Sequence, residues 1–218
     1  MSGESRRREP LLVGAVGALA AILFIALFRL RRLGPLDFWA WLTVNVVLVT
    51  ALAFLADKEY LGRLRRDVRS GLGRKLAVGI GSAAVLYAVF AVGRVLARRL
   101  LPFADAALAN VYALRMGVPD WRVALLIVLV IGPGEELFWR GFFQERAAAT
   151  TCPSYGLALA AMLYTAVHLA SGNLMLVIAA AVCGLFWGWL YMRFRSPLAN
   201  MVSHTVWDLA VFLVFPFL

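Results

Sequence analysis

The feature that most limits what this chain can fold into is a series of long apolar runs. Hydrophobic residues make up 63% of the 218 positions and charged residues 16%, against about 25% charged residues in soluble domains. A helix needs about 20 apolar residues to cross a hydrocarbon core of about 30 Å. Seven runs approach this length: Leu11 to Leu30, Leu36 to Ala56, Leu76 to Ala97, Trp121 to Phe143, Tyr155 to Ala170, Leu174 to Met192 and Pro197 to Pro216.

These runs predict an all-α fold, a polytopic transmembrane helical bundle of about seven spans. None of them shows the alternating ten-residue segments of an outer-membrane barrel. The first run follows a basic segment, as in a signal peptide, but Arg29, Arg31 and Arg32 follow it in place of a cleavage site. We therefore expect an uncleaved membrane anchor. The segment from Arg98 to Asp120 is too polar to span and is expected to contain a helix in the membrane interface.

The net charge of +10 is concentrated beside the predicted spans. Arg6 to Arg8 precede the first span, and seven basic residues lie from Lys58 to Lys75, between the second and third. The positive-inside rule then predicts a cell-membrane protein with a cytoplasmic amino terminus. Anionic lipid headgroups explain this charge pattern better than nucleic acid does, so we expect lipid contacts and no nucleic-acid partner. Cys152 and Cys183 are expected to be free thiols.

Two adjacent glutamates, Glu135 and Glu136, interrupt the apolar run ALLIVLVIGPGEELFWRGFF. A charged side chain at the bilayer centre costs at least about 2.5–3.5 kcal/mol on insertion scales, so the pair indicates a functional site. The preceding Gly132-Pro133-Gly134 predicts a kink or local unwinding. Residues four apart share a helix face, so Glu136 is expected to pair with Arg140 while Glu135 points elsewhere.

Both histidines of the chain also fall within predicted spans. His168 lies in the fifth, and His204 lies in the last span, four residues before Asp208 and on the same helix face. Polar groups in lipid turn inward to find partners. We therefore expect six residues to converge on one cavity: Glu135, Glu136, Arg140, His168, His204 and Asp208.

A carboxylate beside an imidazole can activate a water molecule, which makes hydrolysis the natural reaction class. The chain has no serine in a GxSxG setting. A zinc site of two histidines and a glutamate is chemically possible, but the HExxH spacing is absent. We expect neither a cofactor nor a bound metal.

Three segments resemble the motifs of the CPBP superfamily of membrane proteins. EELFWR is similar to its EExxxR motif, YTAVH to a variant of FxxxH, and HTVWD to HxxxN/D, over roughly Leu125 to Leu213. The superfamily includes type II CAAX prenyl endopeptidases and bacteriocin-processing or immunity proteins. The resemblance implies a catalytic helical core over residues 101–218, preceded by amino-terminal spans and a basic loop over residues 1–100.

This resemblance implies an intramembrane glutamate protease. Glu135 and His168 would hold and deprotonate the attacking water, and His204 with Asp208 would stabilise the oxyanion. Glu136 and Arg140 would order the helix that carries Glu135. The implied substrate is a membrane-anchored protein or peptide, cut near its carboxy terminus.

Two positions depart from the family pattern. Tyr164 replaces phenylalanine in the second motif and adds a hydroxyl that is able to hydrogen-bond in the cavity. Asp208 stands where many members have asparagine, and an ionised aspartate cannot donate a hydrogen bond to an oxyanion. We expect Asp208 to be ionised and to orient His204. The alternative is a protonated Asp208 that donates to the oxyanion itself.

Three other functions remain open from the sequence. The same fold is compatible with a non-catalytic immunity or sorting protein and with a zinc-dependent membrane peptidase. A proton-coupled carrier would also place Glu, His and Asp in the membrane. A carrier, however, is expected to show polar residues through several helices or an internal repeat, and neither is evident here.

Overall fold

The computed structural model describes residues 3–217, and it describes the side chains of the first helix from Leu11 onward. The predicted basic group Arg6 to Arg8 lies outside these described side chains. Across the described range the regular structure is helical, apart from one isolated bridge between Leu33 and Leu36. The all-α prediction is confirmed.

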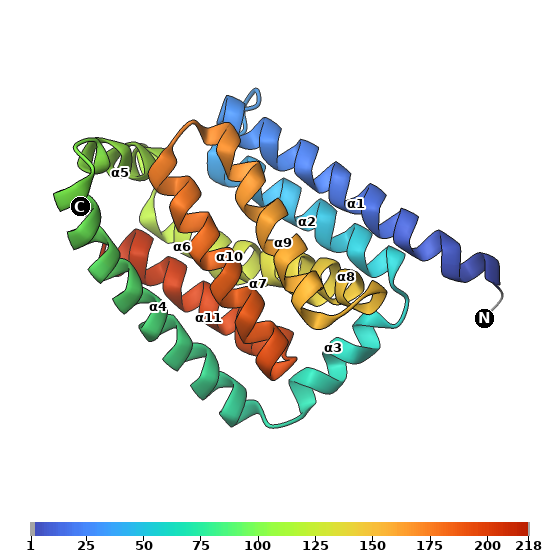
Figure 1. Cartoon of the computed structure of the whole chain (residues 1–218). Helices are drawn as coiled ribbons and strands as arrows, with labels where there is room; N and C mark the ends of the chain where they lie inside the picture. Colours follow the sequence, from blue (N-terminus) through green and yellow to red (C-terminus); the bar gives the residue numbers. More distant parts are fainter. Residues whose placement is uncertain (1–2, 218) are drawn as a thin grey trace.

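The helices form one bundle (Figure 1). Their bounds are α1 Gly3–Leu30, α2 Phe38–Ala56, α3 Tyr60–Arg69, α4 Leu72–Leu100, α5 Ala104–Tyr112, α6 Asp120–Leu126, α7 Gly132–Glu136, α8 Glu145–Thr150, α9 Pro153–His168, α10 Leu174–Phe194 and α11 Pro197–Leu209.

Six helical stretches in the described range are long and apolar enough to cross a membrane: Leu11–Leu30, Phe38–Ala56, Leu72–Leu100, Pro153–Ser171, Leu174–Phe194 and Pro197–Val214. They agree with six of the seven predicted spans, shifted by a few residues at their ends. The seventh prediction, Trp121 to Phe143, falls in a helical run that carries Glu135, Glu136 and Arg140 near its middle. These charges set that run apart from the six apolar stretches.

The charged run consists of α6, α7 and α8, joined by π-helical segments Ile127–Ile131 and Leu137–Gln144. It lies behind α9 and α10 in Figure 1. Proline lacks the N–H that an α-helix requires, and the wider turns of a π-helix accommodate such interruptions, often at functional sites. The predicted break at Gly132-Pro133-Gly134 therefore takes the form of wider helical turns and not of an unwound loop.

Neighbouring helices approach the backbone of this run closely at three glycines. A Cβ atom at Gly132 would clash with Thr205, at Gly134 with Val46 and at Gly141 with Tyr60. Two carbonyls of the run accept hydrogen bonds from outside it: Thr50 Oγ1 donates to Gly134 O at 3.1 Å, and Tyr60 Oη donates to Leu137 O at 2.7 Å. The helix that carries the glutamates is therefore held in place from several sides.

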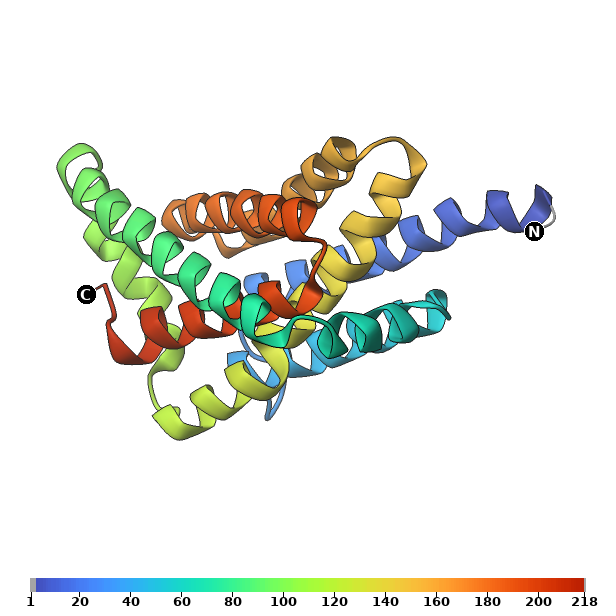
Figure 2. The same cartoon turned by 90° about the horizontal axis from the view of Figure 1, so that it is seen from below.

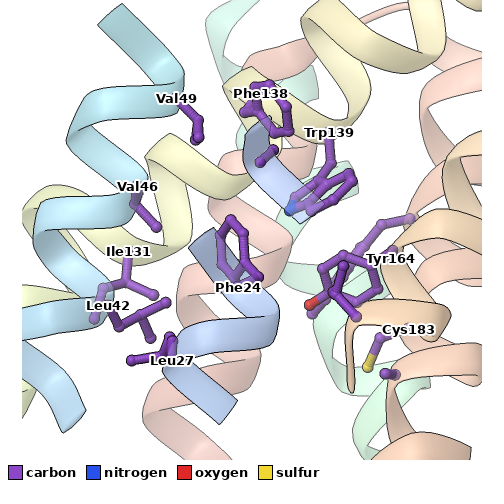
Figure 3. Packing of buried hydrophobic residues seen from close by; sticks show 14 of the residues in the cluster. Phe24, Leu27, Leu42, Val46, Val49, Ile131, Phe138, Trp139, Tyr164 and Cys183 are labelled. Atoms are coloured by element: carbon purple, nitrogen blue, oxygen red, sulfur yellow. The ribbon is translucent and has the colours of Figure 1, made fainter. Parts of the chain in front are cut away.

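One hydrophobic core joins the amino-terminal helices to the rest of the bundle. Phe24 of α1 lies between Val46 of α2 on one side and Trp139 and Tyr164 on the other (Figure 3). The Phe24 and Trp139 ring centroids are 5.7 Å apart. On the opposite side of the bundle, α4 packs along α11 (Figure 2). The predicted division into residues 1–100 and 101–218 stays a prediction, and the two parts share this core.

Most of the basic connecting segments meet at one end of the bundle. Asp57, which follows α2, is buried and accepts hydrogen bonds from Arg63 and from Arg146. Burial raises the pKa of Asp57, but these hydrogen bonds and the two positive charges lower it more, so the pKa lies below the ordinary value. Asp67 accepts hydrogen bonds from Ser196 and Leu198 at the start of α11. The cytoplasmic location of this end stays a prediction.

The short helix α5 lies at the other end, within the segment predicted to contain an interfacial helix. Tyr112 Oη donates to Val211 O at 3.0 Å, and Asn173 Nδ2 donates to Ala107 O at 2.7 Å. The 3-10 turn after α5 is tied to α2, because Trp39 Nε1 donates to Leu114 O at 3.0 Å. These bonds fix α5 against α10 and the last helix.

Candidate active site

The structure buries all six predicted site residues. Their exposed fractions are 7% for Glu135, 0% for Glu136, 1% for Arg140, 8% for His168, 3% for His204 and 6% for Asp208. The two glutamates lie on α7, Arg140 on the following π-helical segment, His168 at the end of α9, and the other two on α11. Three parts of the chain that are distant in sequence therefore supply the buried polar groups.

Glu136 is surrounded by hydrogen-bond donors. Its Oε1 lies 2.7 Å from Arg140 Nη1 and 2.8 Å from His204 Nδ1. Its Oε2 accepts a hydrogen bond from Asn200 Nδ2 at 3.0 Å. A carboxylate held in this way by a cation and two further donors is a structural element that ties the glutamate helix to α11.

Arg140 completes this buried pair. Its second guanidinium nitrogen donates to the carbonyls of Cys183 and Gly184 on α10, each at 3.4 Å. Its guanidinium carbon lies 4.9 Å from the Tyr164 ring centroid and 5.5 Å from that of Trp187. Arg140 thus links α9 and α10 to Glu136, and the predicted pairing of Glu136 with Arg140 is present.

Glu135 has different surroundings from those of its neighbour. Tyr164 Oη donates to Glu135 Oε2 at 3.1 Å. Among the described residues, no other hydrogen bond to this carboxylate is found. Glu135 also lines a cavity of about 320 Å³, whose wall includes His168, His204 and Asp208. One carboxylate therefore faces free space next to both histidines.

The hydrogen bond made by His168 determines which of its ring nitrogens carries the proton. His168 Nδ1 lies 2.7 Å from the carbonyl oxygen of Tyr164. A carbonyl only accepts hydrogen bonds, so Nδ1 carries the proton and Nε2 of the neutral ring remains an acceptor. Tyr164 therefore holds both groups, Glu135 through its hydroxyl and His168 through its backbone.

His204 is held at Nδ1 and on one face, and Asp208 lies beside its other nitrogen. Nδ1 bonds to Glu136, and Nε2 lies 3.5 Å from Asp208 Oδ2. The ring stacks on Trp187 with centroids 3.8 Å apart and planes 23° apart. Sequence reasoning assigned the orientation of His204 to Asp208, whereas the shorter contact in the structure is the one from Glu136.

Two residues of this cluster were not predicted from the sequence. Asn200 donates to Glu136 and also to Trp187 O at 2.8 Å, and Trp187 supports the His204 ring. Asn200 lies four residues before His204, so a search for polar residues at helical spacing would have found it. Trp187 gives no such signal, because aromatic residues are common throughout the apolar runs.

Metal binding has no ready set of ligands in this arrangement. Within residues 3–217, no three His, Cys, Asp or Glu side chains lie close enough together to hold one ion. A zinc site of Glu135, His168 and His204 would require these side chains to move. Both cysteines are free: Cys152 is exposed and Cys183 is buried in the wall of the cavity.

Comparison with known proteins agrees with this geometry. A family model described as type II CAAX prenyl endopeptidase Rce1-like matches residues 117–210, a segment that contains all six predicted site residues. No match was found among curated proteins or among solved structures. Of the six residues expected to converge on one cavity, Glu135, His168, His204 and Asp208 line it, whereas Glu136 and Arg140 pair with each other outside its wall. Over residues 117–210, this chain is therefore similar to the Rce1-like type II CAAX prenyl endopeptidases, a family of proteases.

Proposed function

We propose that the protein is an intramembrane endopeptidase of the glutamate type. It hydrolyses a peptide bond near the carboxy terminus of a membrane-anchored protein or peptide. The observation that carries this proposal is the different environment of the two adjacent glutamates. Glu136 is occupied by three donors, whereas Glu135 faces a cavity that His168 and His204 also line.

In the proposed reaction, a water molecule binds between Glu135 and the unprotonated Nε2 of His168. Glu135 accepts a proton from this water as its oxygen attacks the carbonyl carbon of the substrate, and the carbonyl π electrons move to the oxygen. The tetrahedral intermediate then collapses, the C–N bond breaks, and Glu135 returns the proton to the leaving nitrogen. The products are a carboxylic acid and an amine, and the carboxylate of Glu135 is regenerated.

His204 is the proposed donor to the oxyanion. Glu136 holds its Nδ1, and the nearby carboxylate of Asp208 favours a protonated Nε2, which then donates to the negative oxygen. Donors that are fixed before the reaction stabilise developing charge strongly, because little reorganisation is required. The stacking of His204 on Trp187 supports this role by fixing the plane of the ring.

The test is cleavage of membrane-anchored reporter peptides by the purified protein in lipid vesicles. Glu135→Gln should lower turnover by about a hundredfold or more, which is a typical contribution of a general base, while the unfolding temperature stays close to that of the wild type. Glu59→Gln, at an exposed glutamate before α3, is the matched control and should cleave normally. Unchanged turnover in Glu135→Gln would refute the assignment of the base.

A second arm of the same assay addresses metal. Turnover should persist in the presence of a chelator, because Glu135 and His168 activate the water without a metal ion in this mechanism. Loss of activity with a chelator, restored by zinc, would support the zinc-dependent alternative. Tight peptide binding without any cleavage would instead indicate the immunity or sorting alternative.

A further inference from the structure

The cavity at Glu135 extends well beyond the buried acids and histidines. From His204 and Asp208 on α11 it continues between α4, α5 and α10, and its wall there is mostly aliphatic and aromatic. In Figure 1, α11 is seen between α4 and α10. The cavity therefore has an inner part with the proposed reacting groups and an outer, apolar part.

Two arginines of α4, Arg94 and Arg98, lie in the wall of this outer part. Arg94 lies in the second turn from the end of α4 and lines the cavity. Its Nε is buried and has no hydrogen-bond partner among residues 3–217. One turn later, Arg98 is paired with Asp105, with Nε and Oδ2 3.1 Å apart. Arg94 thus presents a guanidinium group that the protein itself leaves incompletely satisfied.

Contacts between aromatic rings connect Arg94 to the inner part of the cavity. Phe90, one helical turn before Arg94, packs against Trp207 with ring centroids 4.8 Å apart. Trp207 precedes Asp208 directly and lies 5.6 Å from Trp187, the ring on which His204 stacks. A ligand that extends along this wall would pass from the histidine to the arginine.

Arg94 is partly buried, and an enclosed N–H without an acceptor is costly, so an anion bound in the cavity would complete the site. The planar guanidinium group matches a carboxylate, to which it can donate two parallel hydrogen bonds. Arg94 and Glu135 line the same cavity, so an anion bound there by Arg94 shares this cavity with Glu135. The occupant of this cavity in the proposed reaction is a peptide.

We propose that Arg94 binds the terminal α-carboxylate of the substrate peptide. This inference rests on the proposed peptidase function and adds a rule for the choice of bond. With one end of the peptide fixed at Arg94 and the scissile bond at Glu135, the enzyme measures the cleavage position from the carboxy terminus. Substrates with a free terminal carboxylate are therefore preferred over the same peptides with a blocked end.

The test compares two reporter peptides of identical sequence, one with a free carboxylate and one with a terminal amide. The wild type should cleave the free acid about tenfold to a hundredfold better, as judged by kcat/KM, the range expected for hydrogen bonds between charged groups. In Arg94→Gln this ratio should fall to near one. Arg99→Gln, an exposed arginine on the same helix, is the control and should keep the wild-type ratio.

Two outcomes would overturn the assignment of Arg94: a preference for the acid that persists in Arg94→Gln, or equal cleavage of acid and amide by the wild type. The assignment would also be overturned if the effect of Arg94→Gln on cleavage depended on phosphatidylglycerol in the vesicles and not on the peptide terminus. Arg94 would then bind a lipid phosphate. That arm compares phosphatidylglycerol with phosphatidylcholine vesicles.

A binding measurement separates this inference from the proposed function. Fluorescent acid and amide peptides are titrated into Glu135→Gln protein with and without Arg94→Gln. Preferential binding of the acid that disappears with Arg94→Gln supports the anchor even if no peptide is ever cleaved. Equal binding of acid and amide in both proteins contradicts the anchor, even if cleavage depends on Glu135.

Discussion

Two regions on either side of one helix contrast sharply in this protein. On one side of α7, the region around Glu136 is a closed network in which Arg140, Asn200 and His204 all donate to one carboxylate. On the other side of α7, Glu135 faces a cavity. Among the described residues, Tyr164 donates the one hydrogen bond to this carboxylate. Both regions are buried in the bundle.

The contrast shows how neighbouring residues of the same type acquire different chemistry. Successive residues on a helix point about 100° apart. Here that rotation directs one carboxylate into packed protein and the other into free space. Glu136 stabilises and orients, and Glu135 remains able to bind and exchange a proton in the proposed mechanism. The following substitutions test this division, beginning with the largest expected effect.

Glu136→Gln should destabilise the fold most. Arg140 would remain buried without its counterion, which typically costs about 3–5 kcal/mol in the free energy of unfolding. Chemical unfolding in detergent micelles, followed by circular dichroism, measures the change. Glu145→Gln is the control, because Glu145 pairs with the more exposed Arg195 and such pairs contribute about 1 kcal/mol or less. A variant as stable as the wild type would break the comparison.

Asp208→Asn should lower the cleavage rate by about tenfold or more without unfolding the protein, because the carboxylate next to His204 Nε2 is lost. His204→Ala serves as the severe reference. The alternative role, a protonated Asp208 that donates to the oxyanion, makes the opposite forecast. In that case asparagine supplies an equivalent N–H, activity is retained, and the pH profile extends further into the alkaline range.

Asp57→Asn extends the comparison to a buried carboxylate outside the membrane spans. The pKa of Asp57 is lowered in the folded protein, so its ionised form stabilises the fold above an unfolded pKa of about 3.9. This stabilisation is lost as the pH falls through the folded pKa. At pH 7 the variant should lose about 1–2 kcal/mol, and the difference from the wild type should shrink on acidification.

Thermal unfolding of both proteins from pH 7 to pH 3 measures that difference. The loss is smaller than for Glu136→Gln because Arg63 and Arg146 are partly exposed and water can hydrate them. Asp105→Asn, at an exposed ion pair with Arg98, should leave stability nearly unchanged. A gap between wild type and Asp57→Asn that stays constant down to pH 3 would contradict this account.

Tyr164→Phe should have the smallest effect, a loss of less than tenfold in turnover. The hydroxyl that donates to Glu135 disappears, while the bond from His168 to the Tyr164 carbonyl remains. One hydrogen bond to a charged group corresponds to about 1.5 kcal/mol or somewhat more, part of which water in the cavity can replace. Tyr155→Phe, at an exposed tyrosine of the same helix, is the control. A hundredfold loss would show that Tyr164 takes part in the reaction itself.

The sequence predicts the helical bundle and the burial of the six site residues because both follow from local patterns. Apolar length identifies the spans, and a spacing of four residues identifies the pairing of Glu136 with Arg140. Contacts between helices have no such local pattern. The bond from Glu136 to His204 joins α7 to α11, and nothing in the spacing indicates which acid the histidine faces. The π-helical segments around Gly132-Pro133-Gly134 likewise depend on how neighbours pack, because the residues alone only predict an interruption.

The three glycines of the glutamate run have a mechanical consequence. Thr205, Val46 and Tyr60 occupy the places where side chains at Gly132, Gly134 and Gly141 would be. A methyl group added at any of these positions would force either that side chain or the glutamate run to shift, and a shift of the run would move Glu135 with it. The glutamate run is therefore in close contact with its neighbours at three points along its length. In the proposed reaction, a substrate would then adjust to the position of Glu135, and we expect the movement that admits it in the opposite wall, where α4, α5 and α10 border the cavity.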